Sequence, residues 1–134
     1  MRSTKIVTSF IRDNDKLLIL KRSNQVKSMK GLWAGISGII ENNEEPLQRA
    51  KIEIFEEVGI TEDKIKLVKT TEEMRINSPQ YKNHEWEIFP FLFEARRPTI
   101  KLNWENSDFK WIKVNELEKF ETVPSLQKVL FNLL

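Results

Sequence analysis

Residues 33–60 read W-A-G-I-S-G-I-I-E-N-N-E-E-P-L-Q-R-A-K-I-E-I-F-E-E-V-G-I. The second half of this segment predicts an α-helix of about three turns. Pro46 suits the first turn of a helix, and Gly59 suits the left-handed position just past the last turn. On a helical wheel, one arc carries the apolar side chains of Leu47, Ala50, Ile54 and Val58, with Phe55 at its edge. We expect this arc to pack against a sheet.

The other face of the predicted helix is acidic. Glu53, Glu56 and Glu57 fall together there, with Arg49 among them. Like charges at this spacing repel each other by roughly a few tenths of a kcal/mol, and the helix dipole disfavours negative charge near the C-terminal end. A hard divalent cation would resolve both conflicts, because oxygen-rich sites suit Mg²⁺ or Mn²⁺. On the helix alone, a solvated acidic face is an equally good interpretation.

The loop before the helix extends this pattern. The spaced positions are Gly38, Glu44, Glu53, Glu56, Glu57, Gly59 and Ile60. This spacing resembles the Nudix box, GX5EX7REUXEEXGU, in which U is a bulky aliphatic residue. Every fixed position matches except one, because Ile52 stands where the family has arginine. Four glutamates and two glycines in register over 23 residues make the resemblance specific, and it extends over most of the chain.

Length and composition narrow the classes of function. A chain of 134 residues predicts a single domain, residues 1–134, with a real core. Its 22 basic and 20 acidic residues give a net charge of +2, so no strong field favours nucleic acid or membrane as a partner. The absence of cysteine excludes disulfides, thiol nucleophiles and Cys–zinc sites. Neither a signal peptide nor an apolar stretch of about 20 residues is present, so we expect a cytoplasmic protein.

Strand and helix patterns flank the box. Strands are expected at residues 5–12, 16–21, 64–70 and 85–95. The first two form a hairpin, and the continuous apolar run in its second strand predicts that both faces are covered. Residues 72–83 read as a strand end followed by a loop, and Pro90 should mark an edge position or a bulge. Helical runs begin at Asn115 and Pro124, and the second should form another layer on the sheet.

These patterns predict an α+β fold with a mixed central sheet between helices. That prediction agrees with the α/β/α sandwich that the Nudix resemblance implies. Many Nudix hydrolases also carry a loop glutamate before a tryptophan that begins the next strand. Glu105, six residues before Trp111, is the best match to that glutamate. The resemblance implies that Glu105 completes the metal shell or positions water, and an exposed loop carboxylate is the alternative.

The resemblance implies hydrolysis of a nucleoside diphosphate linked to another group, by water attack on phosphorus. It implies Mg²⁺ or Mn²⁺ as cofactor, held by Glu53, Glu56, Glu57, Glu105 and the main-chain carbonyl of Ser37. Glu53 is our candidate for the general base or a direct ligand. Gly38 should let the backbone turn close to the metal. Glu44 should fix the loop to the helix.

Ile52 is the departure from the family pattern. In the family, the arginine at this position holds the catalytic glutamate by a salt bridge, and isoleucine has no donor. Arg49 lies one turn before Glu53 on the same face, so we hypothesise that it takes over this orienting role. The alternative is weak activity, or a nucleotide sensor that binds without cutting. A third reading, an isomerase of isopentenyl diphosphate type, is disfavoured by the absence of cysteine.

Substrate recognition is less constrained by the sequence. The loop from Lys21 to Lys30 carries four positive charges and suits phosphate oxygens, with Arg22 as the best single candidate and a solvated loop as the alternative. Pro79 and Tyr81 fall later than expected for ADP-ribose or dinucleoside polyphosphate enzymes, which favours nucleoside triphosphates. Several aromatic residues could stack a base, although each also fits the core or its rim: Trp33, Tyr81, Trp86 and Trp104. The resemblance also admits a homodimer.

Overall fold

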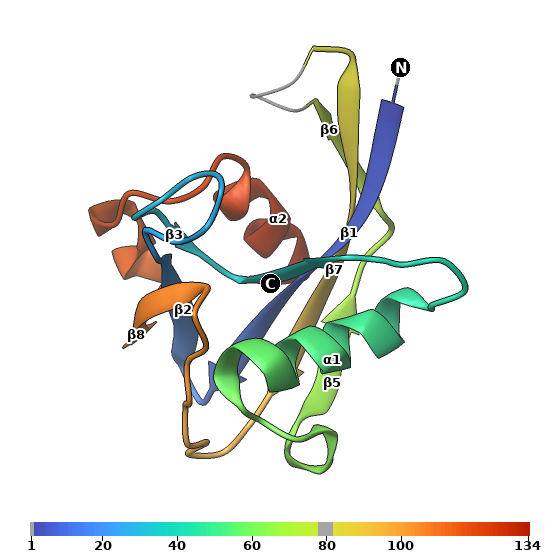
Figure 1. The fold of residues 1–134 in the computed structure, drawn as a ribbon. Helices are drawn as coiled ribbons and strands as arrows, with labels where there is room; N and C mark the ends of the chain where they lie inside the picture. The colour runs from blue at the N-terminus through green and yellow to red at the C-terminus, as the bar shows by residue number, and fades with distance from the viewer. Residues whose placement is uncertain (1, 78–81) are drawn as a thin grey trace.

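The computed structural model describes residues 2–77 and 82–134. Within these residues, one mixed sheet of eight strands lies between two α-helices (Figure 1). The strands are β1 (Arg2–Asp13), β2 (Lys16–Arg22), β3 (Trp33–Ala34), β4 (Ile36–Ile39), β5 (Lys66–Thr70), β6 (Met74–Asn77), β7 (His84–Glu94) and β8 (Asn106–Ile112). The helices are α1 (Pro46–Val58) and α2 (Leu126–Leu133), with 3₁₀ turns η1 (Glu62–Lys64) and η2 (Val114–Lys119). The predicted α+β class is confirmed.

The centre of the sheet is a long parallel pair of strands. β1 and β7 run together from Arg2 opposite His84 to Arg12 opposite Glu94. β2 and β4 pair antiparallel with β1, while β5 and β6 pair antiparallel with β7. The predicted hairpin of β1 and β2 is confirmed, and β2 also pairs with β3 and β8. Its residues 17–20 are buried and alternate between two cores, as expected for a strand covered on both faces.

The two helices cover opposite faces of this sheet. Ala50, Ile54 and Val58 of α1 are fully buried in one core. The other core takes its helical side chains from α2, which are Leu126, Val129, Leu130 and Leu133. Each fully buried aliphatic side chain of the Val, Leu or Ile type stabilises the fold by about 1.5–3 kcal/mol. The predicted α/β/α sandwich is therefore confirmed, with α2 as the second helical layer.

The ends of α1 also follow the prediction. Pro46 is its first residue, where the missing N–H leaves no hydrogen bond unmade. Gly59 follows the last turn with φ of 76°, a left-handed value, and its N–H donates to the Phe55 carbonyl at 3.0 Å. In the described residues, no helix is both long and apolar enough to span a bilayer.

Three details of the sheet differ from the sequence analysis. The polar stretch after Thr70 contains a strand, β6, in which Met74 and Ile76 are half-buried and pack on the α2 core. Pro90 lies in β7, which is a central strand because it pairs with β1 on one side and with β5 and β6 on the other. On that second side, Pro90 occupies the break where the partner of β7 changes from β6 to β5. Its missing N–H therefore costs no hydrogen bond between strands. β8 begins at Asn106, so Trp111 lies near the end of that strand.

Candidate active site

The acidic face of α1 divides into a buried part and an exposed part. The side chains of Glu53 and Glu57 are one turn apart, and these residues are only 8% and 4% exposed. Carboxylates are rarely buried this far unless they are paired or bind a cation. Glu56, by contrast, lies at the exposed surface. The structure therefore brings together two of the three helical carboxylates that the sequence places on one face.

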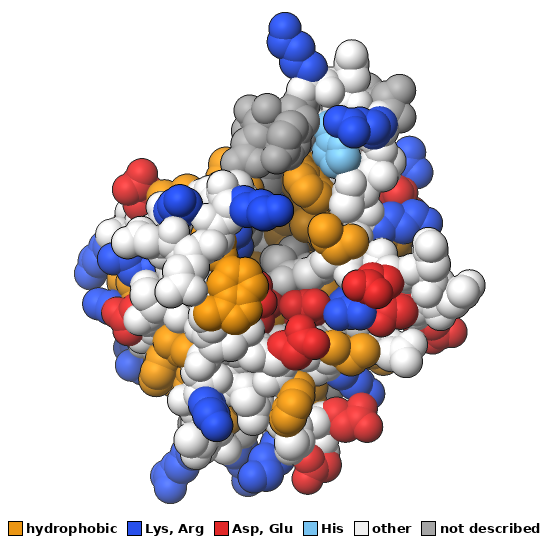
Figure 2. All heavy atoms as spheres, viewed as in Figure 1, with side chains coloured by type: hydrophobic (Ala, Val, Ile, Leu, Met, Phe, Trp, Pro, Cys, Tyr) orange, Lys and Arg blue, Asp and Glu red, His pale blue; other side chains and the backbone are white. Residues whose placement is uncertain are grey.

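Glu105 joins these two carboxylates from the turn before β8. One carboxylate oxygen each from Glu53, Glu57 and Glu105 lie within 4.8 Å of one another. Figure 2 shows acidic side chains gathered at the centre of this face of the molecule. Among the described residues, the buried Oε2 of Glu57 has no hydrogen-bond partner. A shared group of carboxylate oxygens with one oxygen unpartnered suits a hard divalent cation.

The electrostatics of the group lead to the same conclusion. Burial, followed by repulsion from Glu105, raises the pKa of Glu57 well above its usual range. Burial also raises the pKa of Glu53, and the hydrogen bond from Arg49 opposes that shift. Like charges crowded in a low-dielectric site are unfavourable until a cation neutralises them. The residues present therefore fit a divalent metal.

Arg49 connects the box loop to the buried carboxylates. Its Nη2 and Nε donate to Glu44 Oε2 and Oε1 at 2.6 and 2.9 Å, and its Nη1 donates to Glu53 Oε2 at 3.0 Å. Glu44 also accepts a bond from the Glu41 amide at 2.8 Å, so it ties the loop to the helix. The bond from Arg49 lowers the pKa of Glu44. Ile52 is oriented differently and lines a hollow on the outer side of α1 beside Phe55.

Gly38 is required by its contact with Glu53. A Cβ atom on this residue of β4 would overlap the carboxyl group of Glu53. Its backbone does not adopt a positive φ, so glycine is required here because a larger side chain has no room, and not because of the backbone conformation. Gly38 therefore acts through the position of Glu53, whereas the sequence analysis expected it to shape the backbone near the metal. The neighbouring Ser37 forms a 3.1 Å hydrogen bond between its hydroxyl and that of Thr8.

Two residues at this site were missed by the sequence analysis. Asn106 is 7% exposed, and its Nδ2 donates to Glu57 Oε1 at 3.1 Å. Ser23 is also buried and binds the turn that carries Glu105, donating its amide N–H to the Glu105 carbonyl at 2.8 Å. The only feature of the sequence that could have indicated a role for Asn106 was its position next to Glu105. No feature of the sequence indicated a role for Ser23.

The candidate phosphate-binding residue lies next to these groups. Arg22 ends β2 and pairs in register with Asn106 of β8. Its Nε donates to the Ser28 carbonyl at 3.2 Å, so the side chain also organises the basic loop. Pro79 and Tyr81, which the sequence analysis used for the substrate, lie outside the described residues.

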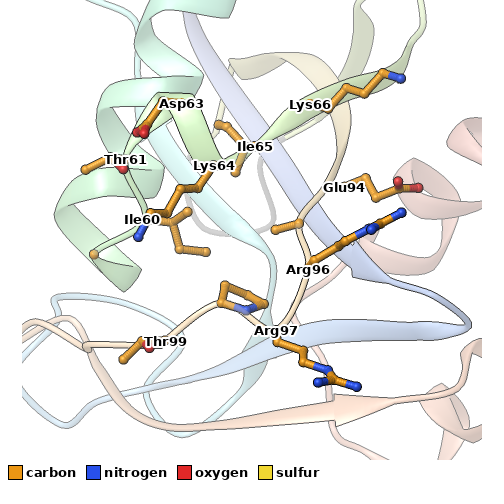
Figure 3. Close-up of a pocket in the computed structure, with 13 residues that line it drawn as sticks. Ile60, Thr61, Asp63, Lys64, Ile65, Lys66, Glu94, Arg96, Arg97 and Thr99 are labelled. Atoms are coloured by element: carbon orange, nitrogen blue, oxygen red, sulfur yellow. The ribbon is translucent and has the colours of Figure 1, made fainter.

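A separate hollow of about 700 Å³ lies where the end of α1 meets β5 and the loop after β7. Figure 3 shows that it is rimmed by charged side chains, including Lys64, Arg96 and Arg97. None of the three clustered carboxylates lines it, and its Glu94 is paired with Arg12 at 3.3 Å. The carboxylate group, not this hollow, is therefore the candidate reaction site.

Comparisons with known proteins agree with this geometry. A family model described as NUDIX domain matches residues 2–133. Dihydroneopterin triphosphate diphosphatase from Haemophilus influenzae is 27% identical, over 96% of this chain and 87% of its own length. The MutT protein from Methanosarcina mazei Go1 is 19% identical with a TM-score of 0.76, over 98% of this chain and 91% of that chain. A C. elegans Ap4A hydrolase is 16% identical with a TM-score of 0.73, over 98% and 93%. Because the family match spans nearly the whole chain, this protein belongs to the Nudix family.

Proposed function

We propose that this protein hydrolyses the phosphate chain of a nucleoside triphosphate, or of a related heterocycle triphosphate, with Mg²⁺ or Mn²⁺ as its metal. As a Nudix family member, it is a metal-dependent hydrolase that cleaves the pyrophosphate linkage of a nucleotide-type substrate. The observation that carries the proposal is the group of Glu53, Glu57 and Glu105, whose oxygens lie within 4.8 Å of one another.

The roles of the side chains follow from their contacts. A bound divalent ion supplies charge neutralisation for the phosphates and lowers the pKa of bound water. We assign Glu53 as general base or metal ligand, and its 3.0 Å bond from Arg49 supports an orienting role for that arginine. Asn106 fixes the orientation of Glu57 through the bond to Oε1. Ser37 would add its main-chain carbonyl, and Glu56 would add a carboxylate from the exposed side of α1.

The preference for a triphosphate has three supports. The positions of Pro79 and Tyr81 in the sequence disfavour ADP-ribose and dinucleoside polyphosphates. The relative from Haemophilus influenzae is named for a triphosphate substrate, dihydroneopterin triphosphate. The four basic residues of the loop from Lys21 to Lys30 suit the extra negative charge of a triphosphate. We therefore place Arg22 and its neighbours on the phosphate chain.

A nucleotide sensor is the second candidate, because Ile52 replaces the arginine of the family pattern. One assay separates the two. Purified protein is incubated with a panel of nucleoside triphosphates, dihydroneopterin triphosphate, ADP-ribose and a dinucleoside tetraphosphate, with Mg²⁺ or Mn²⁺ and with or without chelator. We expect metal-dependent release of phosphate or pyrophosphate from triphosphates. Tight binding of a triphosphate with no product formed would favour the sensor.

Two further expectations from the sequence stay predictions. The first is a cytoplasmic location. The second is a homodimer, which light scattering on the purified protein would reveal as twice the mass of the 15.9 kDa chain.

A further inference from the structure

Trp104 is an exposed aromatic side chain on the turn that carries Glu105, one of the three clustered carboxylates. It is 60% exposed, whereas Trp33 is only 8% exposed and belongs to the α2 core. Figure 2 shows exposed apolar side chains directly beside the acidic ones at the centre of this face. Single exposed apolar residues are common and need no explanation by themselves. The position of Trp104 is different, because the next residue in the chain is Glu105.

The turn that carries Trp104 is fixed by several hydrogen bonds, most of them to its main chain. The Glu105 amide donates to Asn103 Oδ1 at 3.0 Å, and Asn103 Nδ2 donates back to Glu105 Oε1 at 3.2 Å. Ser23 donates its hydroxyl to the Trp104 carbonyl at 2.7 Å and its amide to the Glu105 carbonyl at 2.8 Å. These bonds fix the backbone on both sides of the indole and leave the ring itself in solvent.

Ser23 also belongs to the basic loop that follows β2. Its two bonds therefore tie the candidate phosphate loop to the main chain of the two residues that carry the Glu105 carboxylate and the Trp104 ring. The Cα atoms of Trp104 and Glu105 are consecutive and so only about 3.8 Å apart. A substrate whose phosphates lie at the carboxylates has its remaining part within reach of this ring.

We propose that Trp104 is the platform on which the planar ring of the substrate stacks, so that the enzyme selects phosphate chains attached to an aromatic heterocycle. This inference rests on the proposed function. It concerns the ring of the substrate, which the carboxylates and their metal do not contact. Stacking tolerates many bases because each has a π-face, and removal of one aromatic platform lowers affinity by roughly 5- to 150-fold. Purines, pyrimidines and pteridines would all be accepted, and inorganic polyphosphate would gain nothing from Trp104.

The test measures binding without turnover. Guanosine and cytidine monophosphate carry the ring and one phosphate but no anhydride bond, so both bind unchanged. We expect Trp104→Ala to weaken their binding in Mg²⁺ by roughly 5- to 150-fold, and Trp104→Phe to retain most of it. The matched control is Phe131→Ala, which removes another exposed aromatic, 54% exposed, from α2. Melting temperatures confirm that each variant is folded.

A second arm uses inorganic tripolyphosphate, which has charge and no ring. Its affinity should be the same in wild type and Trp104→Ala, whether it is measured by calorimetry or as inhibition. Quenching of tryptophan fluorescence by the monophosphates should also fall in Trp104→Phe, although the other tryptophans of the four remain. Equal monophosphate affinity in wild type and Trp104→Ala overturns the proposal, and so does an equal loss for tripolyphosphate.

These outcomes are separable from those of the proposed function. If triphosphates are hydrolysed and Trp104→Ala leaves the KM unchanged, the stacking proposal fails while the hydrolase stands. If no triphosphate is hydrolysed but the monophosphates bind through Trp104, the platform stands on a protein that binds without cutting.

Discussion

Replacing Arg49 by alanine removes the donor that holds Glu53. The two side chains are 12% and 10% exposed, so the 3.0 Å bond between them is largely shielded from water. A hydrogen bond to a charged group contributes about 1.5–3 kcal/mol. For a domain of this size, 1 kcal/mol corresponds to about 3 °C in Tm, so the metal-free variant should melt about 5–10 °C lower. The lost bonds to Glu44 act in the same direction. Saturating Mg²⁺ should reduce the difference, because a cation also neutralises Glu53.

The kinetic effect should exceed the effect on binding. A positioned general base contributes roughly 10²–10⁴ in rate, so Arg49→Ala should lower kcat by at least about 10²-fold with little change in KM. Ile52→Arg restores the arginine of the family pattern and should partly rescue the Arg49→Ala enzyme. The double mutant tests whether both positions serve one role, since shared roles are not additive.

Steady-state kinetics and thermal melting of the same four proteins make the comparison. An unchanged kcat in folded Arg49→Ala would refute the orienting role and leave Glu53 held by the metal alone. A kcat that falls only in proportion to the folded fraction would show that Arg49 acts on stability and not on chemistry.

Three further results are expected. In Gly38→Ala, the new Cβ meets the Glu53 carboxyl, and a displacement of about 1 Å should lower kcat by about 10²-fold; an unchanged kcat would make that contact dispensable. Because the pKa of Glu57 is raised in the folded state, the metal-free folded protein binds more protons than the unfolded chain above about pH 4.5. Its stability should therefore fall as the pH rises through the folded pKa of Glu57. Stabilisation by Mg²⁺ should grow over the same range, because the metal binds the deprotonated carboxylate. Melting temperatures with and without Mg²⁺ from about pH 5 to about pH 8 check both signs, and a Mg²⁺ effect independent of pH would contradict them. Glu56→Gln should keep the fold and lower turnover at limiting Mg²⁺, and full activity there would remove Glu56 from the predicted ligands.

Much of the site could be predicted because the box is a local pattern. The ends of a helix are decided by nearby residues, so the prediction of α1 from Pro46 and Gly59 was correct. The one-turn spacing of Arg49 and Glu53 on a helix is also local, and it predicted the side-chain pair that the structure contains. Glu105 was found only through the family resemblance, since nothing in its neighbourhood indicates that it meets α1.

The remaining features depend on contacts between distant segments. Asn106 bonds Glu57 across 49 positions of sequence, and Ser23 bonds Trp104 across 81. The burial of Glu57 and the exposure of Glu56 could not be separated on a helical wheel, because the direction of the sheet and of β8 decides which side is covered. β6 was missed for a similar reason, since its pairing with β7 and not its polar composition makes it a strand.

The central claim is that Glu57 and its neighbours form a metal site that carries out hydrolysis. The most direct test is Glu57→Gln, assayed for product release from a nucleoside triphosphate with Mg²⁺ and for melting temperature without metal. The matched control is Glu62→Gln, which alters a 71% exposed carboxylate paired with Lys51. We predict that Glu57→Gln melts at an equal or higher temperature without metal, loses its stabilisation by Mg²⁺ and loses turnover, whereas the control keeps both. Near wild-type, Mg²⁺-dependent turnover by folded Glu57→Gln would contradict the claim.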